Sequence, residues 1–156
     1  MVFHIEAGAT ILGSTNLADY QDVLDMERKK KGQWHAALIV GSEISYVEIS
    51  GRGIVNGNNV FNPDGEERMR GPHAIFFNKS DGISIRDIFV KDAGNYAHIM
   101  DGCTNGSLRG VIVTGGWDGI DLFNCKNWLI TDCQFMTGDD SIAGADGKRL
   151  LFPIAP

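Results

Sequence analysis

The sequence has no apolar run of 18 residues, only three cysteines, and fewer basic than acidic residues. Without such a run it offers no membrane-spanning helix, and three cysteines cannot form the paired framework of a disulfide-rich protein. The formal net charge of −6 argues against a surface that wraps a polyanion. We therefore expect neither a membrane nor a nucleic acid among the partners of this protein.

No signal peptide is visible at the N-terminus, which reads MVFHIEAGAT, because no basic segment is followed by an apolar segment and a cleavage site. We expect either a protein that stays inside the cell or a sequence that starts after the natural N-terminus. A length of 156 residues suffices for a single domain with a core. The 43% of hydrophobic and 22% of charged residues are typical of a globular chain.

Glycine is abundant, with 20 residues separating short β-branched runs, which indicates many short strands joined by tight turns. The segments 81–103, 104–125 and 126–147 form a repeat of 23, 22 and 22 residues, and residues 45–57 are a looser copy that contains Val47 and Ile49. The matching positions are Ile85, Leu108 and Ile130; Ile88, Val111 and Cys133; Val90, Val113 and Phe135; and Ser80, Cys103 and Cys125.

Within each repeat apolar and polar residues alternate, as in a half-buried strand. A unit of this length with no helix fits one coil of a parallel β-helix, an all-β solenoid whose core forms only when coils stack. A leucine-rich repeat needs a leucine and asparagine spacing that is absent, and a β-sandwich lacks so strict a register. We predict parallel strands within 83–90, 106–113 and 128–135, stacked with Ile85, Leu108 and Ile130 in the core.

The cysteines are expected to be buried and reduced. Cys103 and Cys125 occupy the same position in adjacent repeats, and Cys133 follows in the third. Stacked positions are close enough for a disulfide, but side chains in an inward ladder run parallel rather than crossed. We predict free thiols that behave as small apolar side chains.

The N-terminal part is less regular. Residues 3–14 alternate and predict the first coil, whereas 14–33 predict a short helix or a loop with Asn16 as a possible cap, including a solvated run at 29–31. Residues 58–73 show no periodicity and predict a long loop, a kind of segment that is often functional. Its Arg68 and Arg70 could meet an acidic ligand, but ordinary solvated arginines are the favoured interpretation.

Two adjacent acids, Asp139 and Asp140, lie one repeat after Asp118, since Asp140 follows Asp118 by 22 residues. Stacked coils are separated by about 4.8 Å, so Asp118 and Asp140 should lie one above the other with Asp139 beside them. We expect the three acids to form one solvent-facing cluster on a single side of the solenoid. Like charges in one patch raise carboxyl pKa values, and such a group can divide into a proton donor and a base that activates water. The inverting glycosidases use this division. The glycines expected to shape these turns are Gly115, Gly116, Gly119 and Gly138.

Other interpretations of these polar residues stay open at this point. An aspartate can cap a turn, and an acidic patch can bind calcium. We expect Asp121 and Asp132 to face solvent from strands, and His98 to be a packing residue, while His73 has no assigned role. Trp117 is either a platform for stacking a sugar or a packing residue.

The segment GWDGIDLFNCKNWLITDCQFMTGDDSIA resembles the paired signature of glycoside hydrolase family 28, the polygalacturonase family. That signature is an Asn-Thr-Asp-Gly-(Ile/Val)-Asp segment followed one coil later by Gly-Asp-Asp. The resemblance covers most of the chain. Its further segments are IEAGATILGSTNLADY, GRGIVNG and GPHAIFFNKSDGISIRDIFVKDA.

The resemblance implies a right-handed, single-stranded parallel β-helix that hydrolyses (1→4)-α-galacturonosyl or related pectic bonds with inversion. It implies that Asp139 is the general acid, that Asp118 and Asp140 hold and activate the attacking water, and that neither a metal nor a cofactor is needed. The expected partner is a pectic or other plant-type polysaccharide or oligosaccharide. The resemblance also implies a secreted or periplasmic protein, monomeric when intact.

The chain departs from the family pattern in ways that bear on activity. Gly116 and Trp117 replace the family's Asn-Thr, and Ser141 replaces a cysteine. The family's later Gly-His-Gly and Arg-x-Lys segments are not found before the final LLFPIAP. We therefore expect residues 1–156 to form a partial β-helix domain that ends with the Gly-Asp-Asp coil.

Weak or no hydrolysis is expected from such a chain, because nothing obvious would neutralise a uronate carboxylate at the cleavage point. A truncated, non-catalytic β-helix that binds carbohydrate or is purely structural is the alternative. A calcium-dependent pectate lyase is disfavoured, because no Arg or Lys lies near the acids in the sequence.

Overall fold

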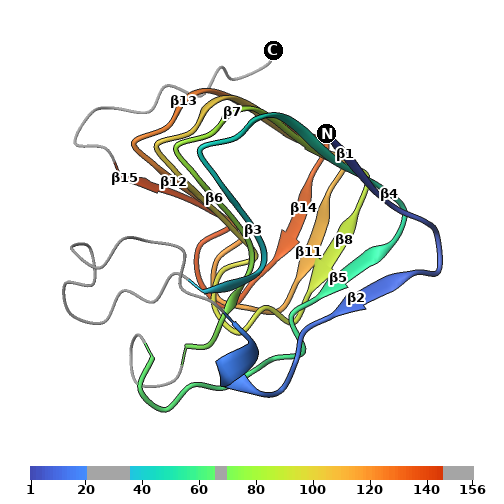
Figure 1. The fold of residues 1–156 in the computed structure, drawn as a ribbon, viewed down its shortest axis with the longest axis vertical. Helices are drawn as coiled ribbons and strands as arrows, with labels where there is room; N and C mark the ends of the chain where they lie inside the picture. Colours follow the sequence, from blue (N-terminus) through green and yellow to red (C-terminus); the bar gives the residue numbers. More distant parts are fainter. Residues whose placement is uncertain (21–35, 66–69, 146–156) are drawn as a thin grey trace.

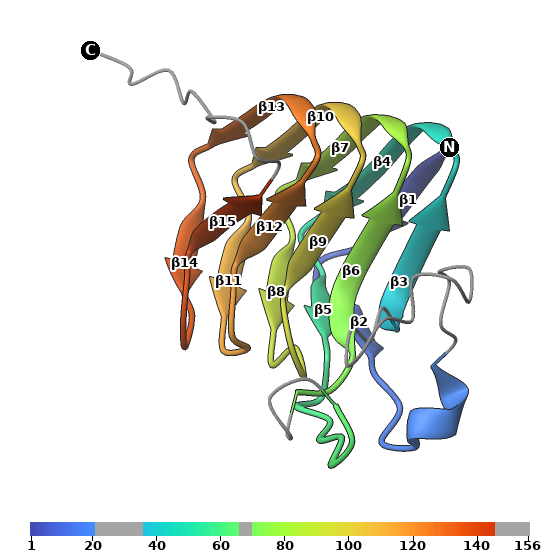
Figure 2. The ribbon, with the colours of Figure 1, turned by 90° about the vertical axis from the view of Figure 1, so that its left-hand side faces the viewer.

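The computed structural model describes residues 1–20, 36–65 and 70–145, and within them the chain winds into a solenoid of stacked coils (Figure 1). Its strands form three parallel sheets, which run along the sides of the solenoid (Figure 2). The first sheet contains β1 (Val2–Ile5), β4 (Ser45–Gly51), β7 (Asp81–Arg86), β10 (Thr104–Arg109) and β13 (Lys126–Thr131). The second contains β2 (Thr10–Leu12), β5 (Ile54–Asn56), β8 (Phe89–Lys91), β11 (Ile112–Thr114) and β14 (Gln134–Met136). The third contains β3 (Ala37–Ser42), β6 (His73–Asn78), β9 (His98–Asp101), β12 (Ile120–Phe123) and β15 (Ile142–Ala145).

The register of the sheets confirms the predicted repeat. Leu108 pairs with Ile85 on one side and with Ile130 on the other, and all of these pairings are parallel. In the second sheet Val113 lies in the same way between Val90 and Phe135. The architecture is therefore a parallel β-helix, as the 22-residue period indicated.

Each predicted strand segment contains two strands instead of one. A corner between the first and second sheets interrupts all three segments, at Asp87, Gly110 and Asp132. These residues have φ angles of 60°, 63° and 56°. The left-handed region that they occupy turns the chain sharply and is open chiefly to glycine, asparagine and aspartate.

The inward side chains form one continuous core. Ile85, Leu108, Val90 and Val113 are fully buried within it, and burial of one such side chain contributes roughly 1.5–3 kcal/mol. Ile130 is only partly buried, because β13 lies at the edge of the first sheet.

The three cysteines are free, as predicted. Cys103 and Cys125 are buried in the core, as predicted, but the prediction that Cys133 is buried was wrong. Cys133 is half-buried, because it lies near the edge of the stack. The thiol of Cys103 donates to the carbonyl oxygen of Phe77, and that of Cys125 donates to the carbonyl oxygen of Met100, both at 3.4 Å.

The N-terminal segment contains the predicted first coil, formed by β1 and β2. Asn16 then caps a short 3₁₀ helix, η1 (Leu17–Asp19), by accepting a hydrogen bond from the amide of Ala18 at 3.2 Å. The rest of the predicted helix or loop, the run at 29–31, Arg68 and the final LLFPIAP lie outside the described residues. No helix in the described ranges is long and apolar enough to cross a membrane.

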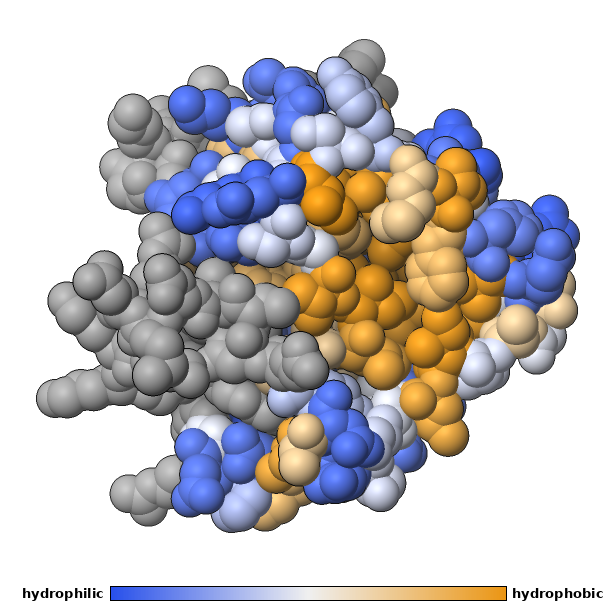
Figure 3. Space-filling view, in the orientation of Figure 1, coloured by the Kyte–Doolittle hydropathy of each residue, from blue (hydrophilic) through white to orange (hydrophobic). Residues whose placement is uncertain are grey.

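The first coil leaves apolar side chains at the surface. Val2, Phe3 and Leu12 are exposed. Val2 and Leu12 lie in the outward rows, beside Glu48 and Asn56, whereas Phe3 lies in the inward row beside Ile49 but at the open edge of the first sheet. Figure 3 shows an apolar area bordered by polar side chains on the face turned to the viewer in Figure 1.

Candidate active site

The turns that lead from the second sheet into the third bring the predicted acids together. Ile120 pairs with Ile142, so two residues earlier Asp118 lies beside Asp140 in the next coil. The amide of Gly119 donates to the carbonyl oxygen of Asp140 at 2.9 Å, and the amide of Asp139 donates to that of Trp117 at 2.8 Å. The stacking expected from the 22-residue offset is confirmed, while the catalytic roles stay predictions.

The region formed by Tyr96, Trp117, Asp118, Asp139 and Asp140 is called the acid corner below. The amide of Asp140 donates a hydrogen bond to Oδ1 of Asp118 at 3.2 Å. The hydroxyl of Thr137 donates to the carbonyl oxygens of Asp139 and Asp140, at 3.5 Å and 3.4 Å. These hydrogen bonds to backbone groups hold the two acid-bearing turns in a fixed relative position.

The acids differ in exposure, which corrects the expectation of one solvent-facing cluster. Asp139 and Asp140 are exposed, whereas Asp118 is only 7% exposed. The reason is position in the stack: the register of β9 and β12 places Tyr96 on one side of Asp118, and Asp140 lies on the other. Asp139 and Asp140 precede β15, the edge strand of the third sheet.

Burial raises the pKa of Asp118 above the ordinary aspartate value, and the nearby charge of Asp139 adds to the rise. The amide of Asp140 and the positive charge of Arg70 partly offset it. Asp118 therefore binds a proton more readily than an ordinary aspartate does, which makes its carboxylate a better base.

Glycine allows the close approach of the coils at the acid corner. Gly116 has a φ of 73° and accepts a hydrogen bond from the amide of Gly138 at 3.0 Å. A Cβ on Gly119 would lie 2.4 Å from the carbonyl oxygen of Ser141 and 2.4 Å from the ring of Phe135. A side chain at position 119 would therefore push the two acid-bearing turns apart.

Arg70 reaches the acid corner from the loop before β6, and the prediction of a solvated arginine was wrong. It is only 5% exposed, and its Nη2 lies 3.5 Å from Oδ2 of Asp139. Its guanidinium carbon lies 4.5 Å from the ring centre of Trp117 and 5.7 Å from that of Tyr96, with Nη1 3.2 Å from the tyrosine hydroxyl. The sequence could have located Arg70. If the repeat is extended one coil back from β9 to β6, the residues just before β6 lie in the coil next to Tyr96.

Trp117 is half-buried and packs on the guanidinium of Arg70, which is a packing role. Its role as a sugar platform stays a prediction. His73 is buried and stacks on Tyr96, with ring centres 5.1 Å apart and planes 25° apart, and its Nδ1 accepts a hydrogen bond from the amide of Tyr96 at 3.3 Å.

His98 is a packing residue, as predicted. It is fully buried in β9, and its Nδ1 donates to the carbonyl oxygen of Gly119 at 2.9 Å. Burial lowers the pKa of His98 to about 4, although the bond to Gly119 opposes the shift. The side chain is therefore neutral at pH 7 and braces the turn that carries Asp118.

The expectation that Asp121 faces solvent was wrong, because it is only 3% exposed. Asp121 lies in one row with Phe76 and Ile99 across the third sheet, and those two side chains belong to a second apolar cluster. That face of the sheet is thus covered as well. Asp132 is exposed, as predicted, but it occupies a corner between strands.

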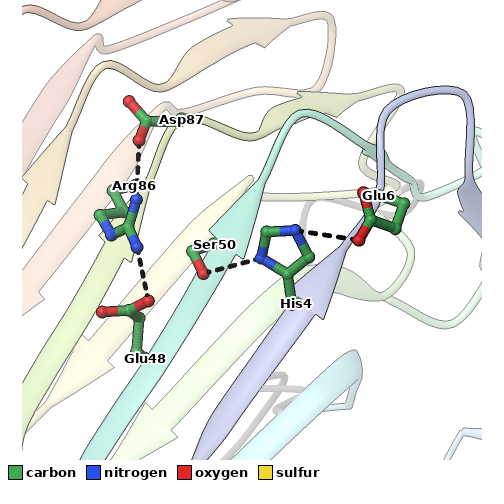
Figure 4. A network of polar contacts seen from close by, with 6 residues as sticks. All are labelled: His4, Glu6, Glu48, Ser50, Arg86 and Asp87. Atoms are coloured by element: carbon green, nitrogen blue, oxygen red, sulfur yellow. Dashed lines mark hydrogen bonds and ion pairs between the residues drawn. The ribbon is translucent and has the colours of Figure 1, made fainter.

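A cavity of about 680 Å³ lies at a different corner, between the first and second sheets. Figure 4 shows the polar side chains around it. Arg86 contacts Glu48 at 2.8 Å and Asp87 at 3.0 Å, and His4 contacts Ser50 at 3.4 Å and Glu6 at 3.5 Å. This region is called the charged corner below. The cavity is lined by His4, Glu6, Ala7, Gly51, Arg52, Arg86, Asp87 and Gly110.

Within residues 1–20, 36–65 and 70–145, no group of three or more His, Cys, Asp or Glu side chains is arranged to hold a metal ion. The acid corner itself holds three carboxyl groups, those of Asp118, Asp139 and Asp140. One is nearly buried with a raised pKa, and two are exposed beside it.

Comparison with known proteins gives a family match over nearly the whole chain. The model of "Glycosyl hydrolases family 28" matches residues 3–153. Two curated relatives are polygalacturonases, from Juniperus ashei at 26% identity over 99 residues and from Chamaecyparis obtusa at 28% over 100 residues. These matches cover 60% and 61% of this chain and 18% of each relative, so the chain spans less than a fifth of their length.

Solved structures share the fold at low sequence identity. The family 28 exopolygalacturonase of Yersinia enterocolitica gives a TM-score of 0.75 at 18% identity, over 93% of this chain and 36% of that one. The hyperthermoactive exopolygalacturonase of Thermotoga maritima gives 0.71 at 18% identity, over 92% and 42%. The polygalacturonase of Erwinia carotovora gives 0.69 at 19% identity, over 92% and 44%. The shared fold is the right-handed parallel β-helix.

Proposed function

Because the chain belongs to glycosyl hydrolases family 28, a family of glycosidases, we propose that it hydrolyses (1→4)-α-galacturonosyl or related bonds of a pectic polysaccharide with inversion. The observation that carries the proposal is the acid corner: Asp118 and Asp140 stack in adjacent coils, and the exposed carboxyl of Asp139 lies next to them. The polygalacturonase names of the relatives support the substrate class.

In the proposed reaction Asp139 donates a proton to the glycosidic oxygen as the bond from the anomeric carbon to that oxygen breaks. With a side chain that is 56% exposed, Asp139 is accessible to a polymer lying on the surface. Water attacks the anomeric carbon from the opposite face of the sugar and loses a proton to a carboxylate. The assignment of the acid to Asp139 instead of Asp140 follows the family motif.

Asp118 suits the role of base within this scheme. Its raised pKa makes it a stronger proton acceptor than an ordinary aspartate. Asp140 fixes it through the amide contact at 3.2 Å, and the exposed carboxylate of Asp140 shares in holding the water. Inversion follows because the attacking water and the leaving oxygen lie on opposite faces.

The experiment is a reducing-sugar assay on the purified 156-residue chain with polygalacturonate, followed over long incubation because slow release is expected. The anomeric configuration of the first product, read by proton NMR, tests inversion. The D118N, D139N and D140N variants should release no more reducing ends than buffer does. D132N, an exposed aspartate at another corner, serves as the matched control.

Two outcomes would contradict the proposal. Equal release by the wild type and by D139N would show that the acid corner does not perform the reaction. No release, combined with binding of oligogalacturonate that the acid-corner variants weaken, would favour the alternative of a non-catalytic carbohydrate-binding β-helix.

A further inference from the structure

Arg70 is a buried cation inside a group of acids. It lies three residues before β6 and 69 residues before Asp139, yet it forms an ion pair with that carboxylate at 3.5 Å. Trp117 and Tyr96 flank the guanidinium at 4.5 Å and 5.7 Å. Burial of a charge is costly unless it is paired and hydrogen-bonded, so an apolar side chain would fill this space at lower cost.

The burial of Arg70 limits what it can do. A guanidinium that is 5% exposed cannot meet a polymer chain directly, whereas its partner Asp139 is 56% exposed. Arg70 can therefore act on a surface reaction only through neighbouring side chains, and its exposed ion-pair partner is Asp139. Its planar group is held against two rings and hydrogen-bonded to the hydroxyl of Tyr96 at 3.2 Å, and Tyr96 is in turn stacked on His73. The guanidinium of Arg70 is therefore held in a fixed position.

We propose that Arg70 is a positioning residue: its guanidinium, held between Tyr96 and Trp117, fixes the carboxyl of Asp139 in the orientation from which it reaches the glycosidic oxygen. This inference rests on the proposed function. It assigns a role to a residue just before β6, outside the family motif at residues 116–121 and 138–140.

Arg70 also acts on the carboxyl of Asp118. The charged groups that act on its carboxyl are Asp139, Asp140 and Arg70. Burial and the negative charges of Asp139 and Asp140 raise the pKa of Asp118, whereas the amide of Asp140 and the positive charge of Arg70 lower it. Removal of the positive charge should therefore move the titration of Asp118 to higher pH, whether or not any substrate is turned over.

The test compares R70Q and R70K with R86Q in the 156-residue chain. Arg86 is the matched control, because it also bridges carboxylates but lies at the charged corner. Side-chain couplings measured by NMR should show one χ1 rotamer for Asp139 in the wild type and in R86Q, and averaged rotamers in R70Q. The titration of Asp118, followed by carboxyl ¹³C NMR, should move upward in R70Q and stay near that of the wild type in R70K.

With polygalacturonate, R70Q should lower kcat by about 10- to 100-fold, the range expected when a reacting group is misplaced, and leave KM nearly unchanged. R70K keeps the charge but lacks the planar fork and the stacking, so it should restore the Asp118 titration without restoring kcat. R86Q should match the wild type in every measurement. If R70Q does not fold, R70K alone provides the comparison of kcat and of the Asp139 rotamer.

Wild-type kcat in both R70Q and R70K would overturn the inference, and so would one χ1 rotamer of Asp139 in R70Q. A wild type that releases no reducing ends contradicts the proposed function instead. In that case the couplings and the Asp118 titration still decide whether Arg70 holds Asp139.

Discussion

At the charged corner, Arg86 contacts Glu48 and Asp87, and all three side chains remain between 31% and 44% exposed. At the acid corner, Arg70 is 5% exposed beside Asp139, and Asp118 is 7% exposed beside Asp140. The first arrangement leaves its charges in water, whereas the second removes a cation and a carboxyl from it. Both are built at turns of the same solenoid.

The two corners differ in what their charged groups cost the folded state in free energy. Exposed ion pairs contribute little to stability, so the charged corner has the arrangement of an ordinary solvent-exposed surface. Buried charges and a carboxyl with a raised pKa destabilise a fold unless they are compensated, and they cluster at functional sites. The contrast therefore supports the acid corner, and not the cavity at the charged corner, as the site of the proposed reaction.

The largest expected effect is on activity at the acid corner. D139N should reduce hydrolysis of polygalacturonate by about 100-fold or more, because loss of a general acid costs 10²–10⁴-fold and an amide has no proton to give. Reducing-sugar release measures it. An equivalent loss in D87N, at the charged corner, would erase the distinction between the two corners.

Replacement of a glycine by alanine should cost more free energy of unfolding at the acid corner than at the corner between the first and second sheets. G119A should destabilise the fold by about 1–3 kcal/mol, because its Cβ would lie 2.4 Å from the carbonyl oxygen of Ser141. G8A is the control: Gly8 has a φ of 84° with no atom within 4 Å of a Cβ, so only backbone strain of about 1 kcal/mol applies. Urea unfolding compares the two, and equal costs would show that the coils at position 119 can move apart.

The pH dependence of stability should differ in D118N. Because the folded state raises the pKa of Asp118, this group contributes stability that is fully present below its unfolded pKa, near 3.8, and is lost as the pH rises through the folded value. D118N removes that loss, so its stability relative to the wild type should increase above about pH 4. Denaturant titrations from pH 4 to pH 7 measure it. Parallel curves would contradict the raised pKa.

The smallest effect is expected at the charged corner. Arg86 and Glu48 are joined at 2.8 Å on the surface of the first sheet, and the contact lowers the pKa of Glu48. Water and salt screen such a pair. R86Q should therefore leave the urea midpoint unchanged within error at 0.15 M salt. A midpoint shift as large as that of G119A would show that the exposed network is a structural element.

Much of the fold follows from local pattern. The 22-residue offset of Leu108 and Ile130, with alternation around each, defines the inward face and the register, because a slip of one residue would turn every apolar side chain outward. The same offset stacks Asp118 and Asp140 in neighbouring coils. The corners at Asp87 and Asp132 were not recognised, since aspartate enters the left-handed region without the clear signal that glycine gives.

The sequence by itself determined the period, the parallel stacking and the family motif, because these depend on residues within one or two coils. Only the tertiary structure decided the exposure of Asp118, the burial of Asp121 and the position of Arg70. The exposure of a side chain depends on which neighbouring coils pack against it, and the local sequence pattern does not specify those neighbours. Arg70 contacts Asp139 because three turns of the solenoid bring together residues that are far apart in the chain. The alternation of apolar and polar residues within a strand does not predict such a contact.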